Sequence, residues 1–193
     1  MKEKIFSIGI VYLLLFTAML FASQNKEEWD PSEHRGLLYD YKTGEPKAII
    51  IVGENAAVSD LKMAELLAKA ILRKYNDVNE KKIDPMSIIV NDTEVTIAMK
   101  QRYNIICIGG PGPVVYYDEK EKIWREDEHC NDLTYEMVKT GKSNINWFES
   151  KGIYEHVPWD PYIGKEIIII AGKDREATAR AVDKFIEDTW KEN

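Results

Sequence analysis

"KAIIIVGENAAVSDLKMAELLAKAILRKY", residues 47–75, decides the fold because it joins two different hydrophobic patterns. Residues 48–52 form an unbroken apolar, β-branched run, which predicts a strand buried on both faces of a covered sheet. After Gly53 the apolar residues recur every three or four positions, which predicts a helix over 59–75 with Ser59 or Asp60 as its N-cap. The recurring residues are Leu61, Ala64, Ala68, Ile71 and Tyr75.

The same strand-then-helix order returns along the chain. Residues 87–92 and 104–108 predict two more short strands, and residues 93–103 a short helix or turn between them. Residues 165–172 predict a fourth strand, followed by a helix over 173–190 that Asp174 caps. We therefore expect an α/β fold with a mostly parallel central sheet of about four strands, covered by helices.

An aromatic-rich insert, residues 111–164, interrupts this order. Residues 114–126 have two β-rich arms around a charged turn, which predicts a β-hairpin. Residues 133–141 predict a short helix, and residues 146–164 a long loop. The aromatic residues form a candidate contact surface, because tyrosine and tryptophan combine a large area with a polar group. Its members are Tyr116, Tyr117, Trp124, Trp147, Trp159 and Tyr162.

The N-terminus carries a membrane-directed segment. Residues 5–22 contain no charge, and Lys2 and Lys4 precede them. Residues 1–22 are therefore a signal peptide or an N-terminal membrane anchor: Ala22 suits cleavage, whereas Leu20 does not. We expect residues 23–46 to be a linker or N-terminal arm and residues 47–193 to be one α/β domain. The protein is then exported, and only its N-terminal segment contacts the membrane.

Charge and cysteine content restrict the partners and the cross-links. The formal net charge of −7 opposes binding to nucleic acid and to anionic lipid. Cys107 and Cys130 are the two cysteines, so an exported chain allows one disulfide between them. Cys107 lies within a predicted strand, where a cysteine commonly serves as a small buried apolar residue.

The segments that follow the predicted strands form a candidate rim, because ligands of α/β sheets bind at the carboxyl ends of the strands. Acidic side chains there could hold a divalent cation, but the same residue types also cap helices and form turns. The glycines lack the spacing and the following helix of a phosphate loop, so we expect no nucleotide cofactor. The rim residues are Asn55, Ser59, Asp60, Asp92, Glu94, Gly109, Gly110, Lys173 and Asp174.

Four stretches together resemble the domain of archaeal S-layer proteins, especially those of methanogens and Thermococcus-like archaea. They are "VGENAAVSD" (52–60), "DTEV" (92–95), "IGGP" (108–111) and "AGKDREATARA" (171–181). The resemblance implies a domain of the cell envelope without catalytic activity. S-layer proteins are several times longer, however, and in them Cys and Asn often follow the Gly-Gly-Pro, where this chain has Gly112 and Pro113.

We therefore expect an exported envelope domain that contacts an envelope protein or a glycan, or associates with itself. One alternative is an exported hydrolase or metal-dependent enzyme that uses the rim, although no Gly-x-Ser-x-Gly elbow is present. In that case Asp60, Asp92 and Asp174, with Asn55, would converge around an open site. A second alternative is a binding module for a glycan or peptide.

Overall fold

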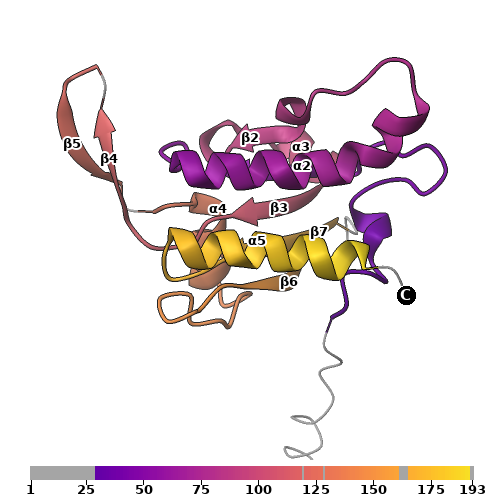
Figure 1. The fold of residues 1–193 in the computed structure, drawn as a ribbon. Coiled ribbons are helices and arrows are strands. Elements are labelled where there is room, and N and C mark those ends of the chain that lie inside the picture. The colour runs from indigo at the N-terminus through magenta and orange to yellow at the C-terminus, as the bar shows by residue number, and fades with distance from the viewer. Residues whose placement is uncertain (1–28, 119, 128, 161–164, 192–193) are drawn as a thin grey trace, which may run out of the picture.

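A computed structural model describes residues 29–118, 120–127, 129–160 and 165–191. Its main sheet has five strands in the order β2-β1-β3-β7-β6 (Figure 1). The strands are β1 (Ala48–Val52), β2 (Ile89–Asn91), β3 (Asn104–Ile108), β6 (Ile153–Asp160) and β7 (Lys165–Ala171). The first four in the sheet order run parallel, whereas β6 pairs antiparallel with β7 at the edge. The predicted α/β class is confirmed.

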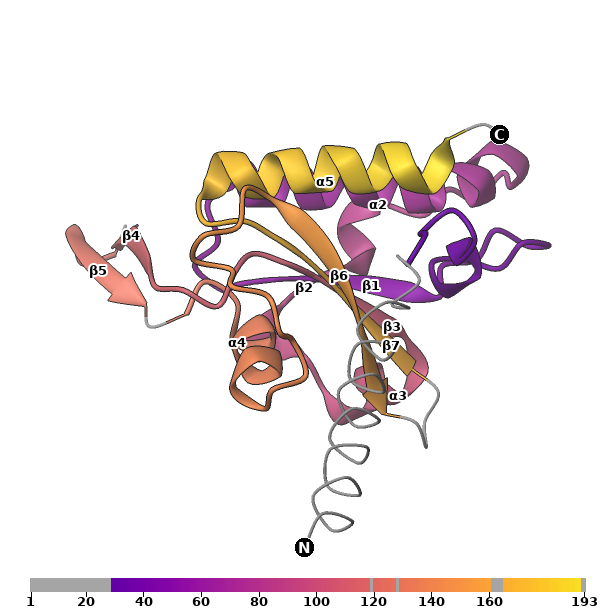
Figure 2. The ribbon, with the colours of Figure 1, turned by 90° about the horizontal axis from the view of Figure 1, so that it is seen from below.

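Helices cover both faces of this sheet (Figure 2). On one face lie the two long helices, α2 (Val58–Val78) and α5 (Arg175–Trp190). On the other face lie α3 (Ile97–Arg102) and α4 (Asp132–Lys139). Three short 3-10 helices, η1 (Arg35–Leu37), η2 (Pro85–Ile88) and η3 (Asp92–Glu94), complete the connections.

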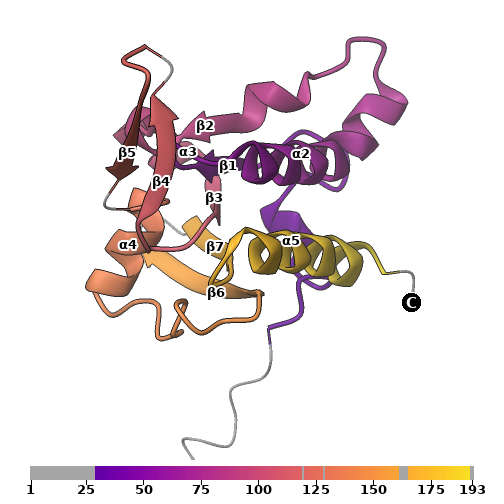
Figure 3. The same cartoon turned by 60° about the vertical axis from the view of Figure 1, so that its left-hand side comes forward.

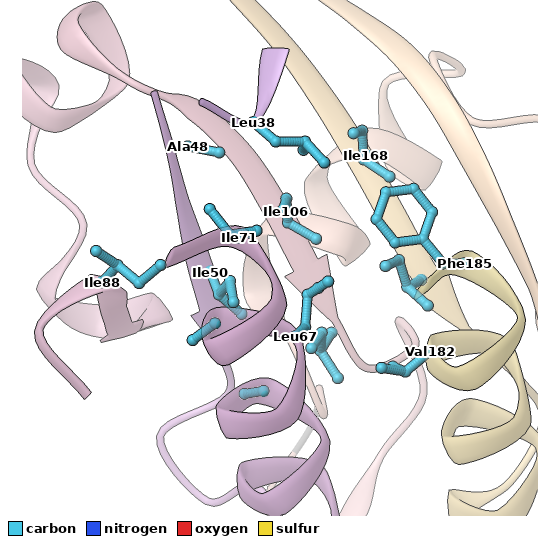
Figure 4. Close-up of a cluster of buried hydrophobic side chains, with 14 of the residues drawn as sticks. Leu38, Ala48, Ile50, Leu67, Ile71, Ile88, Ile106, Ile168, Val182 and Phe185 are labelled. Atoms are coloured by element: carbon cyan, nitrogen blue, oxygen red, sulfur yellow. The ribbon is translucent and has the colours of Figure 1, made fainter. Parts of the chain in front are cut away.

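The central strands are buried on both faces, which explains their unbroken apolar sequences. On the side of α2 and α5, Ile50, Ile106 and Ile168 stand in register on neighbouring strands. Leu67 and Phe185 from the two helices pack onto them (Figure 4). Each such side chain contributes about 1.5–3 kcal/mol of burial free energy.

The opposite core packs the alternate side chains of the same strands against α4 and the segment after it. Ile51, Cys107 and Ile169 contribute from the sheet, and Met137 from α4. Trp147 is 1% exposed in this core, and its indole N–H donates to Ser143 Oγ at 2.9 Å. Trp147 was predicted to be a contact residue, and that prediction is wrong because the loop folds inward to fill the space beside the sheet.

Strand β6 is a correction to the predicted long loop. Residues 153–160 form the antiparallel edge strand, with Val157 buried at 1% exposure. Pro158 lies within the strand, a residue that argues against a central strand but is tolerated at an edge. The register shifts between Pro158 and Asp160, so the irregularity is confined to the end of the strand.

The N-terminal arm packs on the domain from residue 29 onward. Leu38 is 1% exposed in the core, and Tyr39 forms an isolated bridge with Pro46. The side-chain amide of Asn104 donates to the Leu37 carbonyl oxygen at 2.8 Å, which ties the arm to the start of β3. Residues 1–22, which are predicted to be a signal peptide or an N-terminal membrane anchor, lie outside the described residues.

The predicted hairpin is confirmed as β4 (Val114–Asp118) and β5 (Ile123–Asp127). These strands form a separate antiparallel sheet in which Tyr116 pairs with Arg125. The hairpin extends away from the body of the domain, beyond the carboxyl edge of the main sheet (Figures 1 and 3). Within the described ranges, no helix is both long and apolar enough to cross a bilayer.

Candidate functional site: the carboxyl edge of the sheet

The predicted rim lies along one edge, because β1, β2, β3 and β7 are parallel and end side by side. In the order β2-β1-β3, the chain passes from β1 to β2 on one side of β1, and then crosses to β3 on the other side of β1. Doubly wound sheets bind ligands at this reversal, in the crevice between the ends of the two central strands. The ends of β1 and β3, at Gly53 and Gly109, are therefore the first place to look for a ligand.

The chain itself fills that crevice. Asn131, which is completely buried, donates its side-chain amide to the carbonyl oxygens of Ile51 and Ile108, at 3.2 Å each. Its Oδ1 accepts from the Thr134 amide at 3.0 Å and so caps α4. Thr134 in turn donates its hydroxyl to the Gly109 carbonyl oxygen at 3.0 Å. The segment that returns from the hairpin therefore closes the gap between β1 and β3.

Asp92 fastens the same segment from the end of β2. Its Oδ1 accepts from the amides of Glu54 and Thr93, and its Oδ2 accepts from the Asp132 amide, each at 2.9 Å. A carboxylate held by three backbone amides is already satisfied as an acceptor. Asp92 therefore links the ends of β1 and β2 to the start of α4.

A pocket of about 640 Å³ remains next to this closed crevice. Its walls are the loop 110–113 after β3, the loop 172–176 after β7, and the N-terminal turn of α2. Gly110, Lys173 and Asp174 from the predicted rim line it, and so does Asp60. Gly109, Asp92, Asn55, Ser59 and Glu94 lie outside its lining.

The N-cap of α2 is Ala57, which makes no side-chain cap, so the prediction of Ser59 or Asp60 is wrong. Asp60 lies in the first turn instead and is 4% exposed. Its Oδ1 is buried and has no hydrogen-bond partner among the described residues. Burial raises the pKa of this carboxyl above its usual value, while the Arg175 charge and the Ala57 amide act in the opposite direction.

Asp174 caps α5 as predicted: its Oδ1 accepts from the Ala177 amide at 2.7 Å. Lys173 and Arg175, on either side of it, are exposed and line the pocket. The Lys173 amide donates to the Ser150 carbonyl oxygen at 2.9 Å, which fixes the loop after β7. Together with the exposed Glu176, these residues place two positive charges, one capped carboxylate and one exposed carboxylate at the pocket mouth.

Several residues that line the pocket lie outside the predicted rim, among them Cys130, Phe148 and Arg175. In the sequence, Arg175 lies within a predicted helix, and Cys130 and Phe148 lie within the aromatic-rich insert. Phe148 is 65% exposed and lies against Gly112, where a Cβ atom would be 3.2 Å from Cε1 of the ring. No local sequence signal marks this wall, because Gly112 and Phe148 are far apart in the chain and meet only in the folded structure.

The two cysteines are free thiols, so the disulfide considered for Cys107 and Cys130 is not formed. Burial raises the pKa of Cys107 to about 12 and that of Cys130 to about 11. Neither thiol is therefore an activated nucleophile, because the reactive species is the thiolate.

Two further predictions can be placed only in part. The backbones of Tyr116, Tyr117, Trp124 and Trp159 lie in strands, but their side chains are outside the described part, and Tyr162 lies outside the described residues altogether. Among the residues that the structure describes, no group of three or more His, Cys, Asp or Glu is arranged to hold a metal ion.

No protein-family model matches the chain, and no curated protein is detectably similar to it.

Proposed function

We propose that this chain is an exported, S-layer-like domain of the cell envelope that acts by contact with another envelope protein or a glycan, without catalysis. The hairpin of β4 and β5 carries the proposal. It forms its own small sheet outside the main one and projects from the body of the domain (Figures 1 and 2). An isolated two-stranded hairpin has marginal stability in water, and its strands present unpaired backbone groups along their edges.

A contact with a partner would satisfy those edges. An extended segment of a second protein can add a strand to an exposed sheet edge through backbone hydrogen bonds. Val114 and Asp127 pair at the base of the hairpin, and the Cys130 amide donates to the Gly112 carbonyl oxygen at 2.6 Å. The hairpin is therefore held at its base by the domain, while its length is presented outward.

The geometry of the rim supports the absence of catalysis in this proposal. A metal-dependent site was expected to draw on Asp60, Asp92 and Asp174 together. Asp92 and Asp174 instead accept hydrogen bonds from backbone amides. The crevice between β1 and β3, where α/β enzymes commonly bind substrate, contains Asn131. The apolar segment 5–22 supports export, and the resemblance to S-layer proteins supports a place in the envelope.

Shortening the hairpin tests the proposal. Because Gly112 and Cys130 are hydrogen-bonded across its base, residues 114–128 can be replaced by a two-residue Asn-Gly turn without stretching the chain. With residues 1–22 removed from both chains, so that the apolar segment cannot attach them to the membrane, the parent chain should sediment with envelope fragments of the producing cell, and the shortened chain should lose at least about tenfold in affinity. Thermal unfolding of both chains checks that the domain is intact. Equal binding by a folded, shortened chain would contradict a contact through the hairpin.

A further inference from the structure

The pocket between the N-termini of α2 and α5 is lined by a buried carboxyl, and one of its oxygens has no hydrogen-bond partner among the described residues. Asp60 is 4% exposed, and its Oδ1 is buried without a hydrogen-bond partner in the described part of the chain. The same residue lines the pocket wall. Buried polar atoms are nearly always hydrogen-bonded, and one that is not calls for an explanation, such as a functional role or a bound water or ion. The Ala57 amide and the Ser59 hydroxyl act on this carboxyl, but its Oδ1 remains an acceptor without a partner beside the pocket.

The charges around the pocket restrict what that donor can belong to. A carboxylate at the back of the pocket disfavours a phosphate or another anion. At the mouth, Lys173 and Arg175 are balanced by the carboxylates of Asp174 and Glu176, so this part of the lining has no net charge that would select an ion of either sign. A neutral molecule that carries both donors and acceptors suits the two regions, because its hydroxyls can donate to Asp60 and accept from Lys173 or Arg175.

One wall of the pocket is apolar and aromatic. Phe148 is 65% exposed, and Pro111 and Pro113 lie on the same side as part of the lining. The volume of about 640 Å³ falls within the usual range for small-molecule sites. A sugar ring combines a C–H face, which packs on an aromatic ring, with hydroxyls at its edge that meet the polar groups.

We propose that this pocket binds a neutral sugar, with Asp60 accepting hydrogen bonds from its hydroxyls and Phe148 packing against one face of its ring. This site is separate from the hairpin and does not depend on the hairpin contact. It adds a ligand class, neutral sugars, to the proposed contact function. The ligand would lie beside the crevice between the ends of β1 and β3, which the chain itself fills. Asp60, Lys173 and Arg175 all line this pocket, Asp60 as a buried residue and the other two as exposed residues.

A titration of the full chain with neutral mono- and disaccharides tests the site. Binding is monitored through the NMR resonances of the backbone amides. A detergent without a sugar headgroup keeps the apolar N-terminal segment in solution without competing. At least one neutral sugar should shift the amide resonances of Gly110, Gly112 and Lys173. Inorganic phosphate and a uronic acid serve as the anionic probes, and glycine as the zwitterionic probe. Stronger binding of any of these than of every neutral sugar would overturn the proposal.

Matched variants show whether the binding uses this pocket. Asp60→Asn preserves shape and should weaken sugar binding at least tenfold, and Phe148→Ala should do the same. Asp77→Asn, which removes the same charge from an exposed position near the other end of α2, should bind like the parent chain. Equal binding by Asp60→Asn, or no response to any neutral sugar up to tens of millimolar, would contradict the inference. The chain with the shortened hairpin should keep its sugar binding, so failure of one proposal is distinguishable from failure of the other.

Discussion

A Cβ atom on Gly53 would lie 1.8 Å from the carbonyl oxygen of Cys130. The two residues come from different parts of the fold: Gly53 directly follows β1, and Cys130 follows the hairpin. Their contact shows that the returning segment rests directly on the end of the central strand. The sheet edge at this point is therefore packed interior, and the usual ligand crevice is closed by the chain.

Gly53→Ala should destabilise the domain by about 3 kcal/mol or more, because the new methyl group would overlap a backbone carbonyl that cannot move freely. Urea unfolding measures the difference. Gly110→Ala is the matched control on the neighbouring strand end, since its Cβ would be 3.6 Å from the nearest atom. It should change the free energy of unfolding by less than about 1 kcal/mol. Similar losses in the two variants would show that Cys130 does not rest on Gly53.

Asn131→Ala should cost about 2–3 kcal/mol, because it removes two hydrogen bonds to strand carbonyls and the cap of α4. Asn144→Ala, at an exposed position, should be nearly neutral. Chemical denaturation of both variants at pH 7 makes the comparison. An Asn131→Ala chain as stable as the Asn144→Ala control would refute the role assigned to the side chain.

Asn131→Asp should lower the free energy of unfolding at pH 7 by more than Asn131→Ala does, since an ionised carboxylate would face the carbonyl oxygens of Ile51 and Ile108. Its pKa would be raised in the folded state. The stability of this variant should therefore rise as the pH falls toward about 4, where the carboxyl takes up a proton and can donate again. Unfolding curves across this range measure the trend relative to the parent chain. A pH-independent difference would contradict the predicted burial.

Cys107 and Cys130 should react slowly with a thiol reagent at pH 8 in the folded protein and fully in urea. With a pKa of about 11, only about a thousandth of Cys130 is thiolate at pH 8. The folded pKa values exceed the ordinary value of 9.0, so the unfolded chain loses these protons first as the pH rises. Stability should therefore fall from about pH 9 toward pH 12. Absence of reactive thiols in unreduced, unfolded protein would instead indicate a disulfide.

Asp60→Asn should increase stability relative to the parent chain as the pH rises above the unfolded carboxyl pKa. Folding raises the pKa of Asp60, so its charged form is less stable in the folded state than in water. Removing the charge relieves that cost, as is common where a residue serves binding rather than stability. Urea unfolding at several pH values gives the difference between the two chains. A parent chain that gains stability over Asp60→Asn with rising pH would show that Asp60 is a structural ion-pair partner.

Much of the fold follows from local sequence. The apolar runs at residues 48–52 and 104–108 have no polar face, so they predict buried parallel strands. Asp174 is a strong cap before a periodic helix, and it forms that cap. Strand β6 was missed because Pro158 and the surrounding aromatics obscure its alternation, and because the pairing of an edge strand depends on a neighbour.

For the candidate site, the sequence predicts only that it lies at the carboxyl edge of the sheet. Parallel strands bring their ends together, so the position of Lys173, Asp174 and Gly110 follows from the fold class. The role of Asn131 does not, because its contact with Ile51 joins residues 80 apart in the chain. Nothing local in the sequence marks this asparagine as different from any other N-cap. The same holds for Asp60, whose burial depends on the loops after β3 and β7.

Fractionation of the producing cell, with the native protein followed by antibody, tests the central claim most directly. The native protein should be recovered with the envelope. The chain with the shortened hairpin should still be exported. After removal of the N-terminal segment, this chain should bind the envelope more weakly than the parent chain without that segment. Recovery of the intact native protein from the cytoplasm would contradict the account.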